Sequence, residues 1–243
     1  MAGFTTATHV FVGNWDNNAT QQHPLGTRAW MNDGRVFRYA QAGGADLIAG
    51  NLLQSAAPIA NHLAKTCPAV AVGATSFTFT PGNTAGAANL YAEGYLSVDT
   101  GAAAENGYTY TISGHPAITA STAFTLSLVD PIQIALSASS TAGLIHNGCK
   151  NVIISATTQT ARTAGVAAYI ISTTKYGWIQ TRGPASVLIN GTPGVAIAVV
   201  PGATTAGSVD VATVAAEINT RTVGHMMQVG VSTKNNLVYL TID

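Results

Sequence analysis

The amino-acid sequence predicts an all-β protein, an antiparallel sandwich or barrel of short strands with little helix. Three observations support this fold class. Apolar residues alternate with Thr or Ser in short runs such as residues 76–80, Ser-Phe-Thr-Phe-Thr, which is typical of a strand with one buried face. Gly and Pro separate such runs at spacings of roughly 8–12 residues. Only one short segment is a good helix candidate.

Residues 1–66 are expected to form an extended N-terminal arm and a β-hairpin. The stretch that runs to about Gln22 is polar and has no period, and it holds an isolated Trp15 among Asn and Asp residues. A tryptophan in such a setting either packs under its own domain or anchors on a neighbouring protein. Both interpretations of Trp15 stay open at this point.

The clearest hairpin signal is Asn32-Asp33-Gly34, which lies between residues 28–31 and residues 35–40. Asp-Gly supplies the positive φ that a tight turn between antiparallel strands requires. Farther along the chain, Pro58 interrupts residues 51–65. Because proline breaks a helix from inside, we expect mostly extended chain there.

Residues 67–243 are expected to form a β-rich body, either one domain or two subdomains that divide near residue 155. Arg182-Gly183-Pro184 is expected to be a turn between two strands, and residues 210–220 are the best helix candidate. The expected strands are residues 70–72, 76–80, 91–98, 108–112, 124–128, 152–154, 166–172, 176–181, 186–189, 195–200, 226–231 and 237–242.

The chain is short of charge. Only 8% of its 243 residues are Asp, Glu, Lys or Arg, against roughly 25% in an ordinary soluble domain, and the formal net charge is zero. Near-zero net charge promotes association, so we expect a structural component that packs against other protein. No cluster of Lys or Arg is present to meet a phosphate backbone, which argues against nucleic acid as a partner.

No membrane is expected as a partner either, because no run approaches the ~18 apolar residues of a membrane helix. The first residues also lack the basic head and apolar middle of a secretory signal, which predicts synthesis in the cytosol. In a cytosolic product, Cys67 and Cys149 are expected to be free, buried thiols.

No catalytic residue, metal site or cofactor is predicted, so the chain is expected not to be an enzyme. The phosphate-binding loop, the fingerprint Gly-x-Gly-x-x-Gly and the nucleophile elbow Gly-x-Ser-x-Gly are absent. Ser172 and Lys175 match Ser-x-x-Lys, but they lie in a β-type run, where residues three apart point to opposite faces. Four possible zinc ligands lack a standard spacing: they are His62, Cys67, His146 and Cys149.

Residues 176–182, Tyr-Gly-Trp-Ile-Gln-Thr-Arg, would place aromatic rings and an arginine on one face of a strand. Protein interfaces are enriched in such faces, and sugar-binding faces can look similar. The alternative is that Trp178 covers one end of the core, with its N–H satisfied at the rim. The partner-contact candidates are Trp15, Trp30, Phe37, Arg38, Tyr39, Tyr176, Trp178 and Arg182.

Four stretches carry a resemblance to a known family. They are residues 91–98 (Tyr-Ala-Glu-Gly-Tyr-Leu-Ser-Val), 110–117 (Tyr-Thr-Ile-Ser-Gly-His-Pro-Ala), 128–132 (Leu-Val-Asp-Pro-Ile) and 176–183 (Tyr-Gly-Trp-Ile-Gln-Thr-Arg-Gly). A tail rich in Val and Ala follows, with a Gly at each turn. In pattern and order, about residues 25–243 resemble the head-decoration (cement) proteins of tailed bacteriophages.

This resemblance implies a β-rich protein that binds the outside of an assembled phage head in many copies, often as trimers. Its partners would be the major capsid protein and further copies of the chain. It would be made in the host cytoplasm and located on the capsid surface of the virion. The family has no catalytic residues to carry over. The alternative is another virion or surface binding module, such as a tail component or a carbohydrate-recognising adhesin.

Overall fold

The computed structural model describes residues 8–9, 15–101, 105–212 and 222–243. Its regular structure within these residues is almost entirely strand, as predicted, and the only helix among them is the short 3-10 turn η1, Ala60–His62. No helix in this part of the chain is long and apolar enough to cross a membrane. The chain forms two compact units. Unit 1 comprises residues 1–56 and 148–243, and unit 2 comprises residues 57–147.

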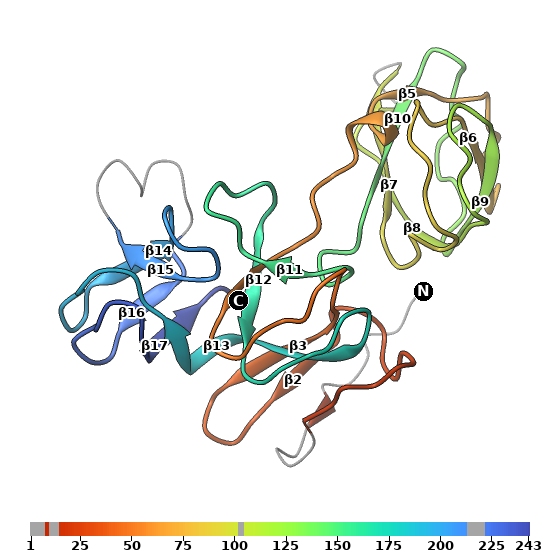
Figure 1. The fold of residues 1–243 in the computed structure, drawn as a ribbon. Helices are drawn as coiled ribbons and strands as arrows, with labels where there is room; N and C mark the ends of the chain where they lie inside the picture. The colour runs from red at the N-terminus through yellow and green to blue at the C-terminus, as the bar shows by residue number, and fades with distance from the viewer. Residues whose placement is uncertain (1–7, 10–14, 102–104, 213–221) are drawn as a thin grey trace. The chain divides into compact units, whose positions relative to one another are not determined.

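Unit 2 contains one sheet of six strands (Figure 1). The strands are β5 Lys65–Thr66, β6 Ser76–Phe79, β7 Tyr95–Thr100, β8 Thr109–Gly114, β9 Phe124–Leu128 and β10 Thr141–Ile145. They pair antiparallel in the order β5-β10-β7-β8-β9-β6. Phe77 and Phe79 of β6 are buried, whereas Ser76 and Thr78 are exposed. The predicted alternation therefore gives the unit one apolar core.

Unit 1 contains a sheet of eleven strands (Figure 1). They are β1 Thr8–His9, β2 Arg28–Trp30, β3 Val36–Gln41, β4 Leu52–Gln54, β11 Ile153–Ile154, β12 Thr163–Ala167, β13 Tyr176–Leu188, β14 Ala198–Pro201, β15 Val209–Val211, β16 Gly224–Met226 and β17 Asn235–Thr241. Eight of them follow the order β1-β2-β3-β13-β17-β16-β14-β15, and β12, β4 and β11 branch from β13. Of the strand pairs between described residues in unit 1, β1 with β2 is parallel and the others are antiparallel.

The predicted hairpin is confirmed as β2 and β3. Gly34 occupies its turn with a φ of +85°, a conformation that favours glycine. The turn is closed by hydrogen bonds between Met31 N–H and the Arg35 carbonyl (3.0 Å) and between Gly34 N–H and the Met31 carbonyl (3.0 Å). Asp33 accepts two further hydrogen bonds, from Arg35 N–H and from Arg35 Nε. The turn residues therefore act as the sequence predicts.

The predicted turn at Arg182-Gly183-Pro184 is wrong, because β13 runs through it. The first half of β13 pairs with β3 and the second half pairs with β17. A β-bulge between Gln180 and Arg182 absorbs the irregularity, and Gly183 has a φ of +83°. Buried Gln180 stabilises the bulge by donating from Nε2 to the carbonyls of Arg182 (3.0 Å) and Pro184 (2.8 Å). Gly and Pro here mark a change of partner strand.

The two units divide the chain at other points than the expected residues 66 and 155. The hairpin β2–β3 belongs to the same sheet as the C-terminal strands, because β3 pairs with β13. Unit 2 is inserted between β4 and β11, which pair with each other. In that pairing Ile153 lies opposite Gln54 and Ile154 lies opposite Leu53. The boundaries are set by a pairing of segments that are far apart in sequence.

Some expected elements fall at the limits of the described residues. The expected helix at residues 210–220 begins in β15, since Asp210 and Val211 belong to that strand, and residues 213–221 lie outside the described residues. Most of the first 14 residues of the expected arm also lie outside them. Both cysteines are buried thiols, Cys67 in unit 2 and Cys149 in unit 1.

Candidate interaction surface

The described part of the N-terminal arm lies along unit 1. Asn18 pairs with Tyr176 through two backbone hydrogen bonds of 3.0 and 2.9 Å. The Trp15 ring meets the Tyr169 ring edge-on at 5.0 Å between centroids, and 61% of Trp15 remains exposed. Asp16 fixes this contact, because its backbone carbonyl accepts a hydrogen bond from the Tyr169 hydroxyl at 2.8 Å. Trp15 therefore rests on its own unit and still offers one side to a neighbour.

Trp178 is a core residue of unit 1, with 3% of its surface exposed. Its indole Nε1–H donates to the Asp16 carboxylate at 2.9 Å, and its backbone N–H donates to the Tyr169 hydroxyl at 2.8 Å. Burial raises the pKa of Tyr169, so this hydroxyl stays protonated and donates in turn to the arm. This is the alternative arrangement considered above, a tryptophan that covers the core with its N–H satisfied at the rim.

Two hairpin aromatics are also core residues. Tyr39 is fully buried, lies edge-on to Trp178 at 5.1 Å between centroids, and stacks with the half-buried Tyr176 at 6.1 Å. Phe37 is buried as well. The expectation that Phe37, Tyr39 and Trp178 contact a partner is therefore corrected, because β3 and β13 pair side by side and direct these rings inward.

Arg38 is held by an ion pair within unit 1. Its Nη2 and Nε lie 2.7 and 2.9 Å from the two carboxylate oxygens of Asp243. Hydrogen bonding from Arg38 lowers the pKa of the Asp243 carboxyl. Arg28 Nε lies 3.5 Å from the same carboxylate, and its guanidinium is stacked on Trp30 at 4.8 Å. Trp30 and Arg38 are thus partly exposed side chains with intramolecular partners, and Arg182 is exposed.

A surface that the sequence analysis did not identify lies over β16, β17 and the adjoining loops. On β17 the outward residues Leu237 and Tyr239 are apolar or aromatic and about 40% exposed. Tyr239 lies opposite His225 of β16, and Met227 N–H bonds to the Leu237 carbonyl. We call this surface the apolar face. Its members are Val195, Ile197, Met227, Val229, Val231, Leu237 and Tyr239.

The segments that form the apolar face are tied together by backbone hydrogen bonds. Gly230 N–H donates to the Pro193 carbonyl at 2.7 Å, and Met226 N–H donates to the Ile197 carbonyl at 2.9 Å. Val231 N–H donates to the Asn236 side-chain oxygen at 2.7 Å. The segments that carry these exposed side chains are therefore neighbours in unit 1.

A sequence signal for the apolar face exists. The 60 residues from Gly183 to Ile242 contain only four charged residues, which are Asp210, Glu217, Arg221 and Lys234. In β17, moreover, Leu237 and Tyr239 occupy outward positions of the kind that Ser and Thr occupy in β6 and β9 of unit 2. A strand that is apolar on both faces has a second surface to cover.

The described residues show no arrangement suited to catalysis by a thiol or a metal. Burial raises the pKa of the Cys67 thiol to about 11 and also raises that of Cys149, so both thiols stay protonated and weakly nucleophilic. Ser172 and Lys175 close a tight turn by a backbone hydrogen bond of 3.0 Å. Across the described ranges, no group of three or more His, Cys, Asp or Glu residues could hold a metal ion.

Comparisons with family models, with curated proteins and with solved structures give no match to this chain.

Proposed function

We propose that this chain is a viral structural protein of the decoration (cement) type, which binds the assembled head of a tailed phage and stabilises it by non-covalent contacts. The observation that carries the proposal is the apolar face. Val195, Val229 and Val231 are each more than half exposed on it, in a chain with zero formal net charge. Contiguous exposed apolar surface marks a site of association with other protein.

A decoration protein acts as a ligand of the assembled shell. Anything that binds only the assembled form stabilises it by RT ln(1 + [L]/Kd), which is about 2.7 kcal/mol at 100 times the dissociation constant. Linking copies of the ligand in an oligomer raises its effective affinity further. The proposed partners are the major capsid protein and further copies of this chain, with a trimer favoured. The proposed location is the capsid surface, after synthesis in the host cytoplasm.

The proposal assigns a binding role and no catalysis. The carbohydrate-binding alternative required the face from Trp178 to Arg182 to be exposed in a groove. Trp178 is buried and its N–H is satisfied by Asp16, so no observation favours that alternative.

The proposal is tested by co-sedimentation of the purified chain with phage heads. Tyr239→Lys places a charge in the middle of the apolar face, and Val129→Lys makes the same kind of change at an exposed site of unit 2. We expect the wild type and the Val129→Lys variant to sediment with the heads. Tyr239→Lys is expected to bind at least tenfold more weakly. Equal binding by both variants would exclude the apolar face as the contact, and no binding by the wild type would exclude the proposed function.

A further inference from the structure

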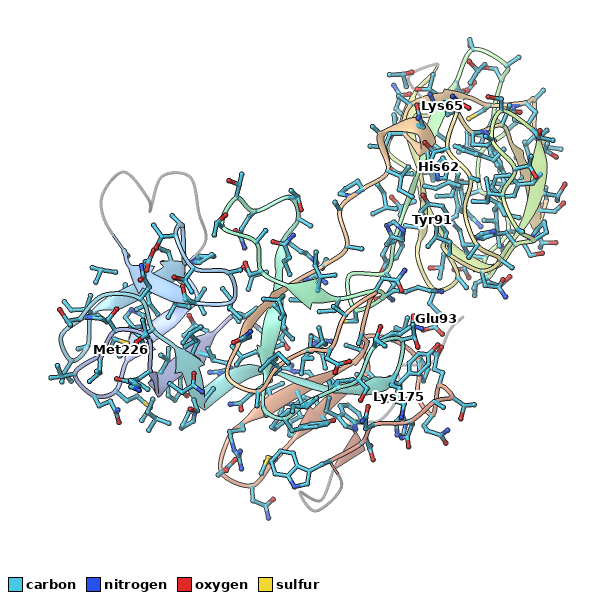
Figure 2. The ribbon with its side chains drawn as sticks, in the orientation of Figure 1. His62, Lys65, Tyr91, Glu93, Lys175 and Met226 are labelled. Atoms are coloured by element: carbon cyan, nitrogen blue, oxygen red, sulfur yellow. The ribbon has the colours of Figure 1, made fainter. Side chains whose placement is uncertain are left out.

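Three of the six histidines lie in unit 2, and all three are buried around one tyrosine. Tyr91 is fully buried in the turn at residues 88–93. His62 ends η1, His115 directly follows β8, and His146 directly follows β10. Figure 2 labels His62 and Tyr91 in unit 2, where their side chains meet. Histidines from three separate elements thus converge on the same phenol ring.

The hydrogen bonds of His62 assign its proton. Its Nε2 lies 2.9 Å from the backbone carbonyl of Thr84, which can only accept, so Nε2 carries the hydrogen. Its Nδ1 lies 2.6 Å from the Tyr91 hydroxyl. Burial raises the pKa of Tyr91, so this hydroxyl stays protonated and donates to Nδ1. Both ring nitrogens of His62 are therefore engaged in hydrogen bonds.

His115 is held in the opposite tautomer. The backbone N–H of Tyr91 donates to His115 Nε2 at 2.9 Å. The other ring nitrogen, Nδ1, lies 2.6 Å from the Pro116 carbonyl and donates to it. A proton added to His115 would have to go on Nε2, where it would face the Tyr91 N–H. Two donors cannot share this position, so protonation of His115 breaks the bond that holds Tyr91.

The turn that these bonds hold is strained. Asn89 and Glu93 have φ values of 58° and 62°, which non-glycine residues rarely adopt. The Asn89 side chain also accepts a hydrogen bond from His115 N–H at 2.9 Å, so the turn is tied to His115 at two points. Such a backbone persists only where its surroundings fix it.

The titratable groups that face Tyr91 and His115 come from every element packed around them. His62 contributes from η1, Glu93 lies two residues from Tyr91 in the same turn, and His146 stacks on the Tyr91 ring at 4.7 Å between centroids. A positive charge on one of these histidines would be repelled by a positive charge on another. The two hydrogen bonds of His115 therefore favour its neutral ring in the closed turn.

We propose that His115 and Tyr91 form a proton-sensitive latch, which holds the turn at residues 88–93 in unit 2 and opens below about pH 6. In an unfolded chain a histidine takes its second proton near pH ~6.5. If the closed latch excludes that proton, the opening equilibrium shifts by up to roughly 30-fold per histidine between pH 7.5 and 5.0. The latch does not depend on the proposed function.

Hydrogen exchange of the full chain, followed by mass spectrometry at pH 7.5, 6.5, 5.5 and 5.0, tests the latch. After correction for intrinsic rates, we expect at least tenfold loss of protection at pH 5.0 in peptides covering residues 86–94 and 109–116. Peptides from β13 in unit 1 are the internal reference and should change less than twofold. Unchanged protection of the latch peptides at pH 5.0 would overturn the proposal.

Two variants separate the latch from general acid unfolding. His115→Gln keeps an oxygen that can accept the Tyr91 N–H, and it cannot take up a proton. We expect it to keep its protection at pH 5.0, whereas His225→Gln, at an exposed site in unit 1, should respond to acid as the wild type does. A His115→Gln protein with the wild-type response to acid would contradict the proposal.

If His115→Gln does not fold, ¹⁵N NMR of the imidazole rings in the wild type decides the question. The structure predicts a neutral His115 with its proton on Nδ1 at pH 7.5. A charged His115, or His115 with its proton on Nε2, would overturn the latch.

Discussion

The strands of unit 1 and of unit 2 both bury alternate apolar residues, but the residues on their outward faces differ. In unit 2 the outward positions of paired strands β6 and β9 are Ser and Thr, and Thr78 lies opposite Thr125. In unit 1 the outward positions in the middle of β17 are Leu237 and Tyr239. Both sheets bury an alternate row of apolar residues. The residues on the outward face therefore distinguish a sheet face that is exposed to water from one that another protein would cover.

The two units also differ in the titratable groups that hold the side chains described above in place. Unit 2 places histidines around Tyr91. Unit 1 uses carboxylates, with Asp16 on the indole of Trp178 and Asp243 on Arg38. Histidine and carboxylate groups titrate in different pH ranges. The units are therefore expected to respond to acid separately, and the contrast can be tested by damaging one unit at a time.

The largest effect is expected from Phe77→Ala, which opens a cavity in the core of unit 2. Phe77 is 1% exposed, and loss of a buried phenylalanine costs about 3–5 kcal/mol. All three tryptophans, Trp15, Trp30 and Trp178, lie in unit 1. Urea unfolding followed by hydrogen exchange should show unit 2 unfolding early, while the transition in tryptophan fluorescence stays in place. Thr78→Ala, at the next, exposed position, is the control. An equal shift of both transitions would show that the units do not fold separately.

A smaller effect is expected from Asp16→Ala, which removes the acceptor of the Trp178 indole N–H. A buried donor left without its partner costs about 1–3 kcal/mol, so the unit 1 transition should move to lower urea. Urea unfolding monitored by tryptophan fluorescence measures the shift. Asn17→Ala, which removes two exposed hydrogen bonds to Ser172, should change it less. An equally large shift in Asn17→Ala would mean that attachment of the arm, and not the hydrogen bond to the indole, stabilises unit 1.

Acid should weaken unit 1 in a lower pH range than unit 2. Hydrogen bonding from Arg38 lowers the pKa of Asp243 in the folded protein. The resulting stability is complete above the unfolded pKa of about 3.9 and is lost as pH falls through the lowered value. Because the pair is partly exposed, we expect about 0.5–1 kcal/mol, and Asp243→Asn should remove it. Thermal unfolding of both proteins at pH 7 and pH 3 checks this. A difference at pH 3 as large as the difference at pH 7 would contradict the assignment.

The smallest effect on stability is expected from Tyr239→Lys, at a position that is 40% exposed. Exposed substitutions change stability by about 0.5 kcal/mol or less. The same change should reduce self-association strongly, since it puts a charge on the apolar face. Sedimentation velocity measures the self-association of Tyr239→Lys separately from its stability, and Val129→Lys is the control. If Tyr239→Lys keeps normal stability and self-associates as the wild type does, the apolar face is not the site of association.

The sequence predicted what is encoded locally. The Asp33-Gly34 turn, the buried row of Phe77 and Phe79, and the extended chain around Pro58 depend on a few neighbouring residues, and the structure confirms them. The insertion of unit 2 was not predicted, because it depends on the pairing of β4 with β11 across about a hundred residues.

The candidate surface was harder to predict than the fold. Strand periodicity placed Trp178 and Tyr39 on strand faces, but only the pairing of β3 with β13 shows that these faces are inside. A strand with sheet neighbours on both sides and side chains packed on both faces has no free face for a partner. The apolar residues on the outer face of β17 were readable from its alternation, since Leu237 and Tyr239 occupy the middle outward positions.

The most direct test of the central claim is cryo-electron microscopy of the native assembly that contains this chain. We predict copies of this chain repeated over a symmetric shell, with Leu237 and Tyr239 buried against another protein subunit. Copies whose apolar face points into solvent, or a chain found alone and monomeric, would contradict it.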